Sequence, residues 1–89
     1  MRIAEILREA TEDYLNYIYL RWVELEHQVP SDPDAVLIEC EFIEKRLLTL
    51  SGRDAEEAES IEIAISSFQE LIARAQAIIR RRDGSATGI

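Results

Sequence analysis

The chain has 89 residues, of which 47% are hydrophobic and 31% are charged, and its formal net charge at pH 7 is −8. This length allows one small domain with one hydrophobic core, and the balance of apolar and charged residues excludes an intrinsically disordered chain. The negative charge disfavours direct binding to nucleic acid, because carboxylates repel the phosphate backbone.

The first predicted helix covers residues 2–27. Its beginning is amphipathic, but from Tyr14 onward apolar and aromatic side chains spread around more than one side of the helix. Tyr17 and Leu20 project from the side opposite to most of the others. Four of the six aromatic residues of the chain lie between Tyr14 and Trp22. A helix that is apolar nearly all round has to be covered on more than one side, so we expect this segment to contact more than one neighbour.

The second predicted helix covers residues 33–50, after a proline-bearing stretch that ends the first. Asp32 is suited to cap it, with Pro33 at the first helical position, where a missing N–H costs nothing. Its apolar stripe consists of Val36, Cys40, Ile43, Leu47 and Leu50. Ile38 and Phe42 lie one turn apart on the far side of this helix, which makes them candidates for a second contact surface.

The third predicted helix covers residues 55–82. Apolar residues recur along it at alternating steps of three and four, which places them on one stripe. These residues are Ala58, Ile61, Ile65, Phe68, Ile72, Ala75 and Ile79. Before this helix, Gly52 is suited to a left-handed conformation that ends the second helix, and Asp54 with Glu57 has the pattern of a capping box. Residues 84–89 are expected to form a flexible C-terminal tail.

Short connections make sequential helices antiparallel neighbours, so the sequence predicts an all-α fold, an antiparallel three-helix bundle with long first and third helices. This bundle forms a single helical domain over residues 1–83. The second helix is about a third shorter than the third, and the apolar area of the long helices exceeds what three helices can cover. We therefore expect the bundle to pack as a dimer or to bind a dedicated partner.

The sequence offers little for catalysis or metal binding. The lone His27 and the lone Cys40 leave no nucleophile–base pair, and no glycine-rich phosphate loop is present. Glu24 and His27 have the spacing of metal-ligating pairs in di-iron helical bundles, but they lie at a helix end beside Pro30 rather than in an apolar seam. We therefore expect that the protein is not an enzyme and that it has no catalytic residue, no cofactor and no bound metal.

The expected location is the cytoplasm. A single cysteine, Cys40, cannot form an internal disulfide, and its place on an apolar stripe predicts a buried thiol, which fits a reducing compartment. Glu5, Arg8 and Glu9 interrupt the apolar residues at the start of the chain, unlike a secretory signal. No segment is apolar for long enough to span a bilayer.

These features favour a non-catalytic helical protein–protein interaction module, such as an adaptor, a chaperone-like protein or a regulatory subunit, that works by helix-on-helix apolar burial. Its partner is expected to be a second copy, another protein or both, with no direct contact to nucleic acid or membrane. The alternative is a small acidic inhibitor that mimics nucleic-acid charge, for example a phage-encoded anti-defence protein that blocks a DNA- or RNA-binding protein. The candidate interface residues are Tyr14, Tyr17, Tyr19, Trp22, Ile38 and Phe42.

Overall fold

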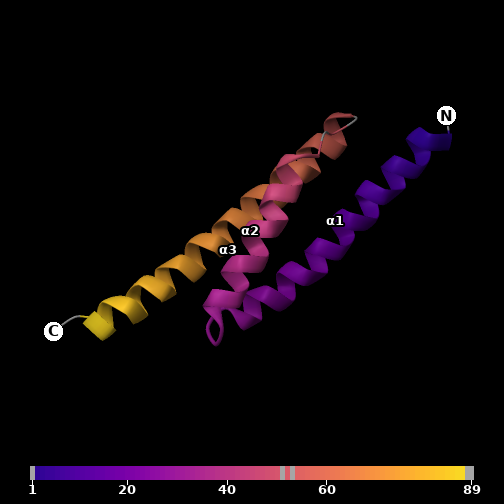
Figure 1. Cartoon of the computed structure of the whole chain (residues 1–89). Coiled ribbons are helices and arrows are strands. Elements are labelled where there is room, and N and C mark those ends of the chain that lie inside the picture. The colour runs from indigo at the N-terminus through magenta and orange to yellow at the C-terminus, as the bar shows by residue number, and fades with distance from the viewer. Residues whose placement is uncertain (1, 51, 53, 88–89) are drawn as a thin grey trace.

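Three α-helices make up the fold. The computed structural model describes residues 2–50, 52 and 54–87, with the side chains of residues 11–84 among them. The helices are α1 (Arg2–Gln28), α2 (Pro33–Leu48) and α3 (Ala55–Thr87). In Figure 1, α1 and α3 run in the same direction and α2 runs back alongside them. The predicted all-α fold of three packed helices is confirmed.

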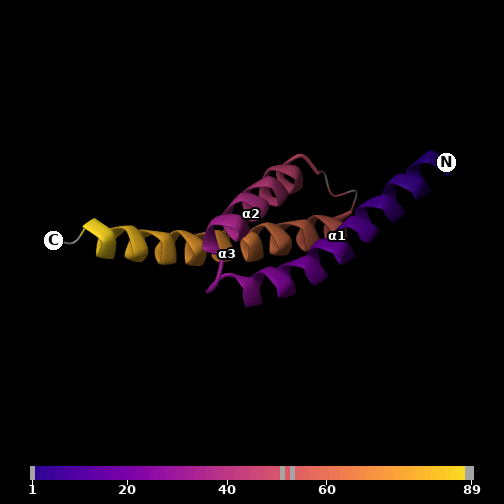
Figure 2. The same cartoon turned by 60° about the horizontal axis from the view of Figure 1, so that its bottom comes forward.

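The molecule is elongated, with principal extents of 63 × 19 × 16 Å. The helices differ in length, with 27 residues in α1, 16 in α2 and 33 in α3. The N-terminal end of α1 and the C-terminal end of α3 therefore extend past the three-helix section at opposite ends of the molecule (Figures 1 and 2). Most contacts between helices join α2 to α3, whereas α1 makes fewer contacts with either.

Hydrogen bonds at the helix starts follow the predicted pattern. The Asp32 carboxylate accepts a hydrogen bond from the backbone N–H of Ala35 at 3.3 Å, and Pro33 occupies the first turn of α2. The predicted N-cap of α2 is confirmed. Ahead of α3, Oδ1 of Asp54 accepts a hydrogen bond from the backbone N–H of Glu57 at 2.8 Å, as a capping box requires.

The connection between α2 and α3 differs from the prediction. The second helix ends at Leu48 rather than at residue 50, because Thr49 bonds back to the helix through its N–H and its hydroxyl. The φ angle of Gly52 depends on residue 51, which lies outside the described residues, so the left-handed conformation of Gly52 stays a prediction. The glycine permits close packing, because a Cβ at this position would lie 2.4 Å from the Cα of Ala58.

The C-terminal end of α3 also differs from the prediction. The helix continues to Thr87 instead of ending at residue 82, and residues 88 and 89 of the predicted tail lie outside the described residues. A glycine inside a helix costs only about 1 kcal/mol, and no proline follows Gly84 to stop the helix. An ion pair between Arg82 and Asp34, with a nitrogen–oxygen distance of 2.6 Å, joins this part of α3 to the start of α2.

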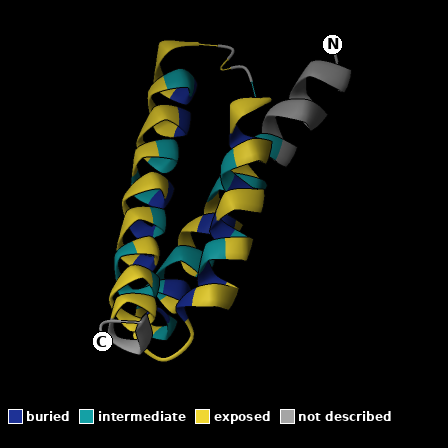
Figure 3. Ribbon diagram, turned by 60° about the vertical axis from the view of Figure 1, so that its left-hand side comes forward, coloured by how far each residue is buried: buried dark blue, intermediate teal, exposed yellow. Residues whose placement is uncertain are grey.

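The core lies where the three helices face one another. Figure 3 shows buried residues on the facing sides of the helices and exposed residues on their outer sides. Cys40 is fully buried, as predicted, and burial raises the pKa of its thiol to about 12, so the thiol stays protonated at neutral pH. The core cluster consists of Ile18, Leu25, Val29, Val36, Cys40, Ile43, Leu47, Phe68, Leu71 and Ala75.

Candidate functional site

Large hydrophobic side chains remain exposed on this small fold. Among the side chains described within residues 11–84, seven are between 59% and 70% exposed. Exposed apolar residues carry information when they gather, and most of these gather on two surfaces. The seven are Tyr17, Tyr19, Leu20, Ile38, Phe42, Leu48 and Ile63.

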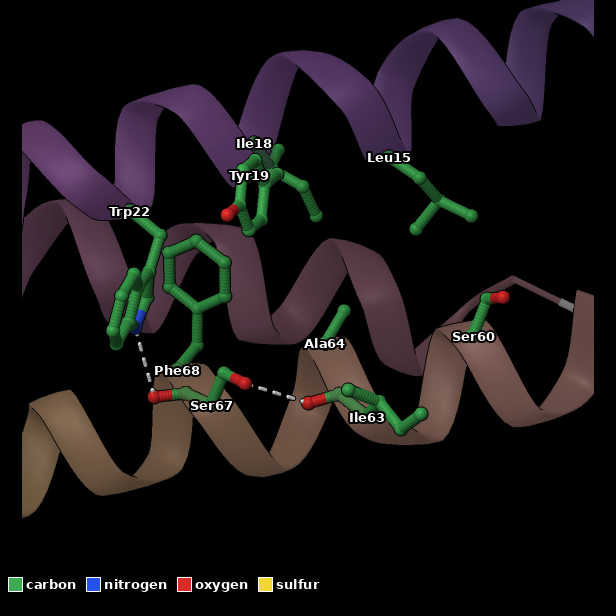
Figure 4. Close-up of a pocket in the computed structure, with 9 residues that line it drawn as sticks. All are labelled: Leu15, Ile18, Tyr19, Trp22, Ser60, Ile63, Ala64, Ser67 and Phe68. Carbon is green, nitrogen blue, oxygen red and sulfur yellow. Dashed lines mark hydrogen bonds between the residues drawn. The ribbon is translucent and has the colours of Figure 1, made fainter.

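The first surface is an apolar groove between α1 and α3, with a volume of about 210 Å³ (Figure 4). We call it the α1–α3 groove. Ile18 and Phe68, each 1% exposed, lie in its interior, while Tyr19 and Ile63 border it and are 67% and 59% exposed. Its lining residues are Leu15, Ile18, Tyr19, Trp22, Ser60, Ile63, Ala64, Ser67 and Phe68.

Trp22 joins the two walls of the α1–α3 groove. Its indole N–H donates a hydrogen bond to the backbone carbonyl of Ser67 at 3.1 Å (Figure 4). The hydroxyl of Ser67 donates in turn to the carbonyl of Ile63 at 2.9 Å, one turn earlier in α3. Trp22 and Phe68 lie together at one end of the groove, and Leu15 and Ser60 lie at the other. The indole therefore fixes the position of α1 against α3 beside the hollow.

The α3 side of this groove is acidic. Glu59, Glu62 and Glu70 share a shallow depression with Ile63 on the outer side of α3. Further along the two helices, Arg74 of α3 lies 3.4 Å from a carboxylate oxygen of Glu26 in α1. An apolar hollow with an acidic border is complementary to an apolar side chain carried between basic residues.

The second surface lies on the side of α2 that faces away from the core. Ile38, Glu41, Phe42 and Lys45 line a shallow depression there, and we call these four residues the α2 outer face. Ile38 is 70% exposed and Phe42 is 67% exposed. Both charged residues are exposed as well, so apolar side chains and charges of both signs lie within two helical turns.

Two contacts join α1 to α2 on either side of Tyr17. The Arg46 guanidinium lies 5.0 Å from the centre of the Tyr14 ring, which is a cation–π distance. Two turns later in α1 and two turns earlier in α2, Nη2 of Arg21 donates to Oε1 of Glu39 at 2.7 Å. Tyr17 lies between these two contacts along α1, as Phe42 does along α2. The ring of Tyr17 is 60% exposed, so α1 also presents an apolar side chain to water between these two contacts.

The six predicted interface residues divide into two groups. Tyr14 and Trp22 are partly buried against the core and join α1 to its neighbours. The other four remain exposed, with Tyr19 at the groove, Ile38 and Phe42 on the α2 outer face, and Tyr17 on α1 between the two contacts to α2. Ile63 is absent from the predicted set. Its neighbours on the same side of α3 are polar, and an isoleucine among polar residues indicates an exposed apolar contact point.

Two other features to consider are a metal site around Glu24 and His27 and a membrane-spanning helix. Glu24 and His27 are both exposed, and within residues 11–84 as described no group of three or more His, Cys, Asp or Glu side chains is arranged to hold a metal ion. Across the described part of the chain, no helix combines the length and apolar character that a membrane crossing requires.

Comparisons with known proteins leave the two surfaces to be interpreted from their own geometry. No protein-family model, no curated protein and no solved structure matches this chain. The arrangement of apolar and charged side chains on the α1–α3 groove and the α2 outer face is therefore the basis of the functional argument.

Proposed function

We propose that this protein is a non-catalytic protein–protein interaction module that works by burying apolar helix surface against another chain. The observation that carries the proposal is the α1–α3 groove, bordered by the exposed side chains of Tyr19 and Ile63. An amphipathic helix laid along this groove would place apolar side chains into the hollow at intervals of one turn. Each border side chain covered in this way contributes about 1–2 kcal/mol of gross binding free energy.

The chain reports on the occupancy of this groove through its own fluorescence. Trp22 is the only tryptophan, and it lines the groove. We would titrate the full chain with a designed helical peptide that carries a leucine stripe between lysines, and follow the Trp22 emission. Binding should shift the emission to shorter wavelength, because the peptide removes water from the indole.

A matched pair of variants tests the location. Ile63→Glu should weaken peptide binding at least about tenfold, because it places a charge beside the apolar hollow. Leu20→Glu makes the same change at a residue that is 64% exposed and lies on neither surface, so it should leave the affinity unchanged. Equal affinities for the two variants, or no emission change with the unmodified chain, would remove the groove from the proposal.

We also propose that the antiparallel bundle forms a homodimer. The exposed fractions of Tyr17, Ile38 and Phe42 support this proposal, because a second copy would remove that area from water. Sedimentation velocity at tens of micromolar protein should detect a dimer that persists at high salt, since apolar area is not screened by ions. A stable monomer under these conditions would end the proposal of self-association.

The second candidate function is an acidic inhibitor that occupies a basic nucleic-acid-binding surface. The acidic border formed by Glu59, Glu62 and Glu70 favours it. Binding to a basic peptide without a leucine stripe measures this contribution separately. Under this alternative that peptide binds as well as the striped one, and both affinities fall steeply as salt is raised.

A further inference from the structure

We infer that the α2 outer face joins two copies of this chain in an antiparallel α2–α2 pair about a two-fold axis. The inference rests on the self-association proposed above and names the face that carries it. Ile38 and Phe42 supply the apolar contact, at 70% and 67% exposure. They lie on the side of α2 opposite to its buried residues, so a second copy can approach them without displacing α1 or α3.

Charge complementarity is the argument for a second copy as the occupant. Glu41 and Lys45 are one turn apart on this face and carry opposite charges. A two-fold axis across an antiparallel helix pair reverses their order, so Glu41 faces Lys45 of the partner subunit. The symmetry repeats the contact, and the dimer gains two ion pairs.

The same symmetry disfavours the α1–α3 groove as a dimer interface. A two-fold contact through the groove would bring the acidic set Glu59, Glu62 and Glu70 against the same set of the second copy. Like charges placed opposite one another oppose association. The α1–α3 groove is therefore complementary to a basic partner, whereas the α2 outer face is complementary to the same face of a second copy.

The ion pairs also determine the register of the helices. Pairing Glu41 with Lys45 of the partner subunit centres the axis between these positions, next to Phe42. The two Phe42 rings then lie close to the axis. The same register places Ile38 beside Leu48 of the partner subunit, and Leu48 is 62% exposed in the single chain. One arrangement thus buries Ile38, Phe42 and Leu48 and forms both ion pairs between Glu41 and Lys45.

Reciprocal charge exchange tests this arrangement by sedimentation velocity of the full chain at low salt. Lys45→Glu alone and Glu41→Lys alone each replace attraction by repulsion, so each should raise the dimer dissociation constant by at least about tenfold. The double variant carrying both changes restores the pairs with reversed sign and should return to within about threefold of the unmodified chain. Glu62→Lys makes the same change of charge as Glu41→Lys on α3 and should not weaken the dimer. Thermal unfolding by circular dichroism checks that every variant is folded.

Each failure has its own pattern. A double variant as weak as the single variants, or single variants as tight as the unmodified chain, overturns the α2–α2 pair. If the unmodified chain is a dimer that Ile63→Glu dissociates while the charge exchange has no effect, self-association stands and the groove carries it. If the unmodified chain is a monomer, both the dimer and this interface are wrong, and peptide binding at the groove remains a separate question.

Discussion

The α2–α3 pair and helix α1 are held in the fold by different means. Along α2, five of 16 residues are buried, and most contacts between helices in the molecule join α2 to α3. Helix α1 contributes Ile18 and Leu25 to the core but makes fewer contacts with either neighbour, and the Trp22 hydrogen bond to Ser67 and the Arg21–Glu39 ion pair add to them. Broad apolar packing holds one pair of helices, whereas a narrower apolar contact and a few polar contacts hold the third.

This difference explains why apolar surface remains along α1. A helix that packs broadly on its neighbours closes the space between them, whereas one held at a few points leaves a hollow beside its contacts. The α1–α3 groove lies next to Trp22 for this reason. Elements with fewer buried contacts also open at lower free energy, so α1 is expected to exchange its amide hydrogens faster than α2 and α3.

The largest expected effect comes from removing a buried leucine from the α2–α3 pair. Leu47 is 0% exposed in α2, so Leu47→Ala should lower the free energy of unfolding by about 3–4 kcal/mol through lost burial and the cavity left behind. Leu15→Ala removes the same atoms from a partly buried position on α1 and should cost about 1 kcal/mol. Urea unfolding followed by circular dichroism measures both. Similar losses would show that α1 is packed as firmly as the pair.

An intermediate effect is expected from the tryptophan that joins α1 to α3. Trp22→Phe keeps an aromatic ring but removes the N–H that donates to Ser67, which should cost about 1 kcal/mol. The effect should be local, with faster hydrogen exchange along α1 and little change along α2. Tyr19→Phe, at a residue 67% exposed, serves as the control and should change neither region. Equal acceleration in all three helices would mean that α1 opens only together with the rest.

Periodicity in the sequence predicted the helices because burial repeats with the helical turn. Ile61, Phe68 and Ala75 of the predicted stripe on the third helix are buried. Leu71 is buried too, although it lies beside that stripe, because α3 packs against two helices and buries a wider surface than one seam. Which neighbour covers which side of a helix depends on long-range packing, and a one-dimensional pattern does not contain it.

For the candidate surfaces, too, helical periodicity predicted one part and long-range packing decided the other. Ile38 and Phe42 lie opposite the buried stripe of α2, so helical geometry alone predicted their exposure. The α1–α3 groove was not predictable in this way, because it depends on the separation of two helices that meet through residues 45 apart in the sequence, Trp22 and Ser67. Ile63 acquires its significance only when α1 is placed beside it.

The smallest expected effect concerns the ion pair between α1 and α2. Hydrogen bonds from Arg21 hold the pKa of the Glu39 carboxyl below its ordinary value. A pKa lowered by folding contributes stability above the pKa of the unfolded chain, and that contribution disappears as the pH falls through the lower folded value. Because both side chains are partly exposed to water, Glu39→Gln should cost less than about 1 kcal/mol at neutral pH.

The pH dependence separates this ion pair from general loss of charge. Glu39→Gln should flatten the decline of stability on the acid side, measured by urea unfolding at a series of pH values below neutrality with Trp22 fluorescence as the signal. Glu62→Gln removes the same charge from an exposed position on α3 and should leave that decline unchanged. If both variants flatten the decline equally, Glu39 acts only through the net charge of the chain. If Glu39→Gln alone does so, an ion pair at the edge of the core positions α1 against α2, next to the helix that carries the surface we assign to the second copy.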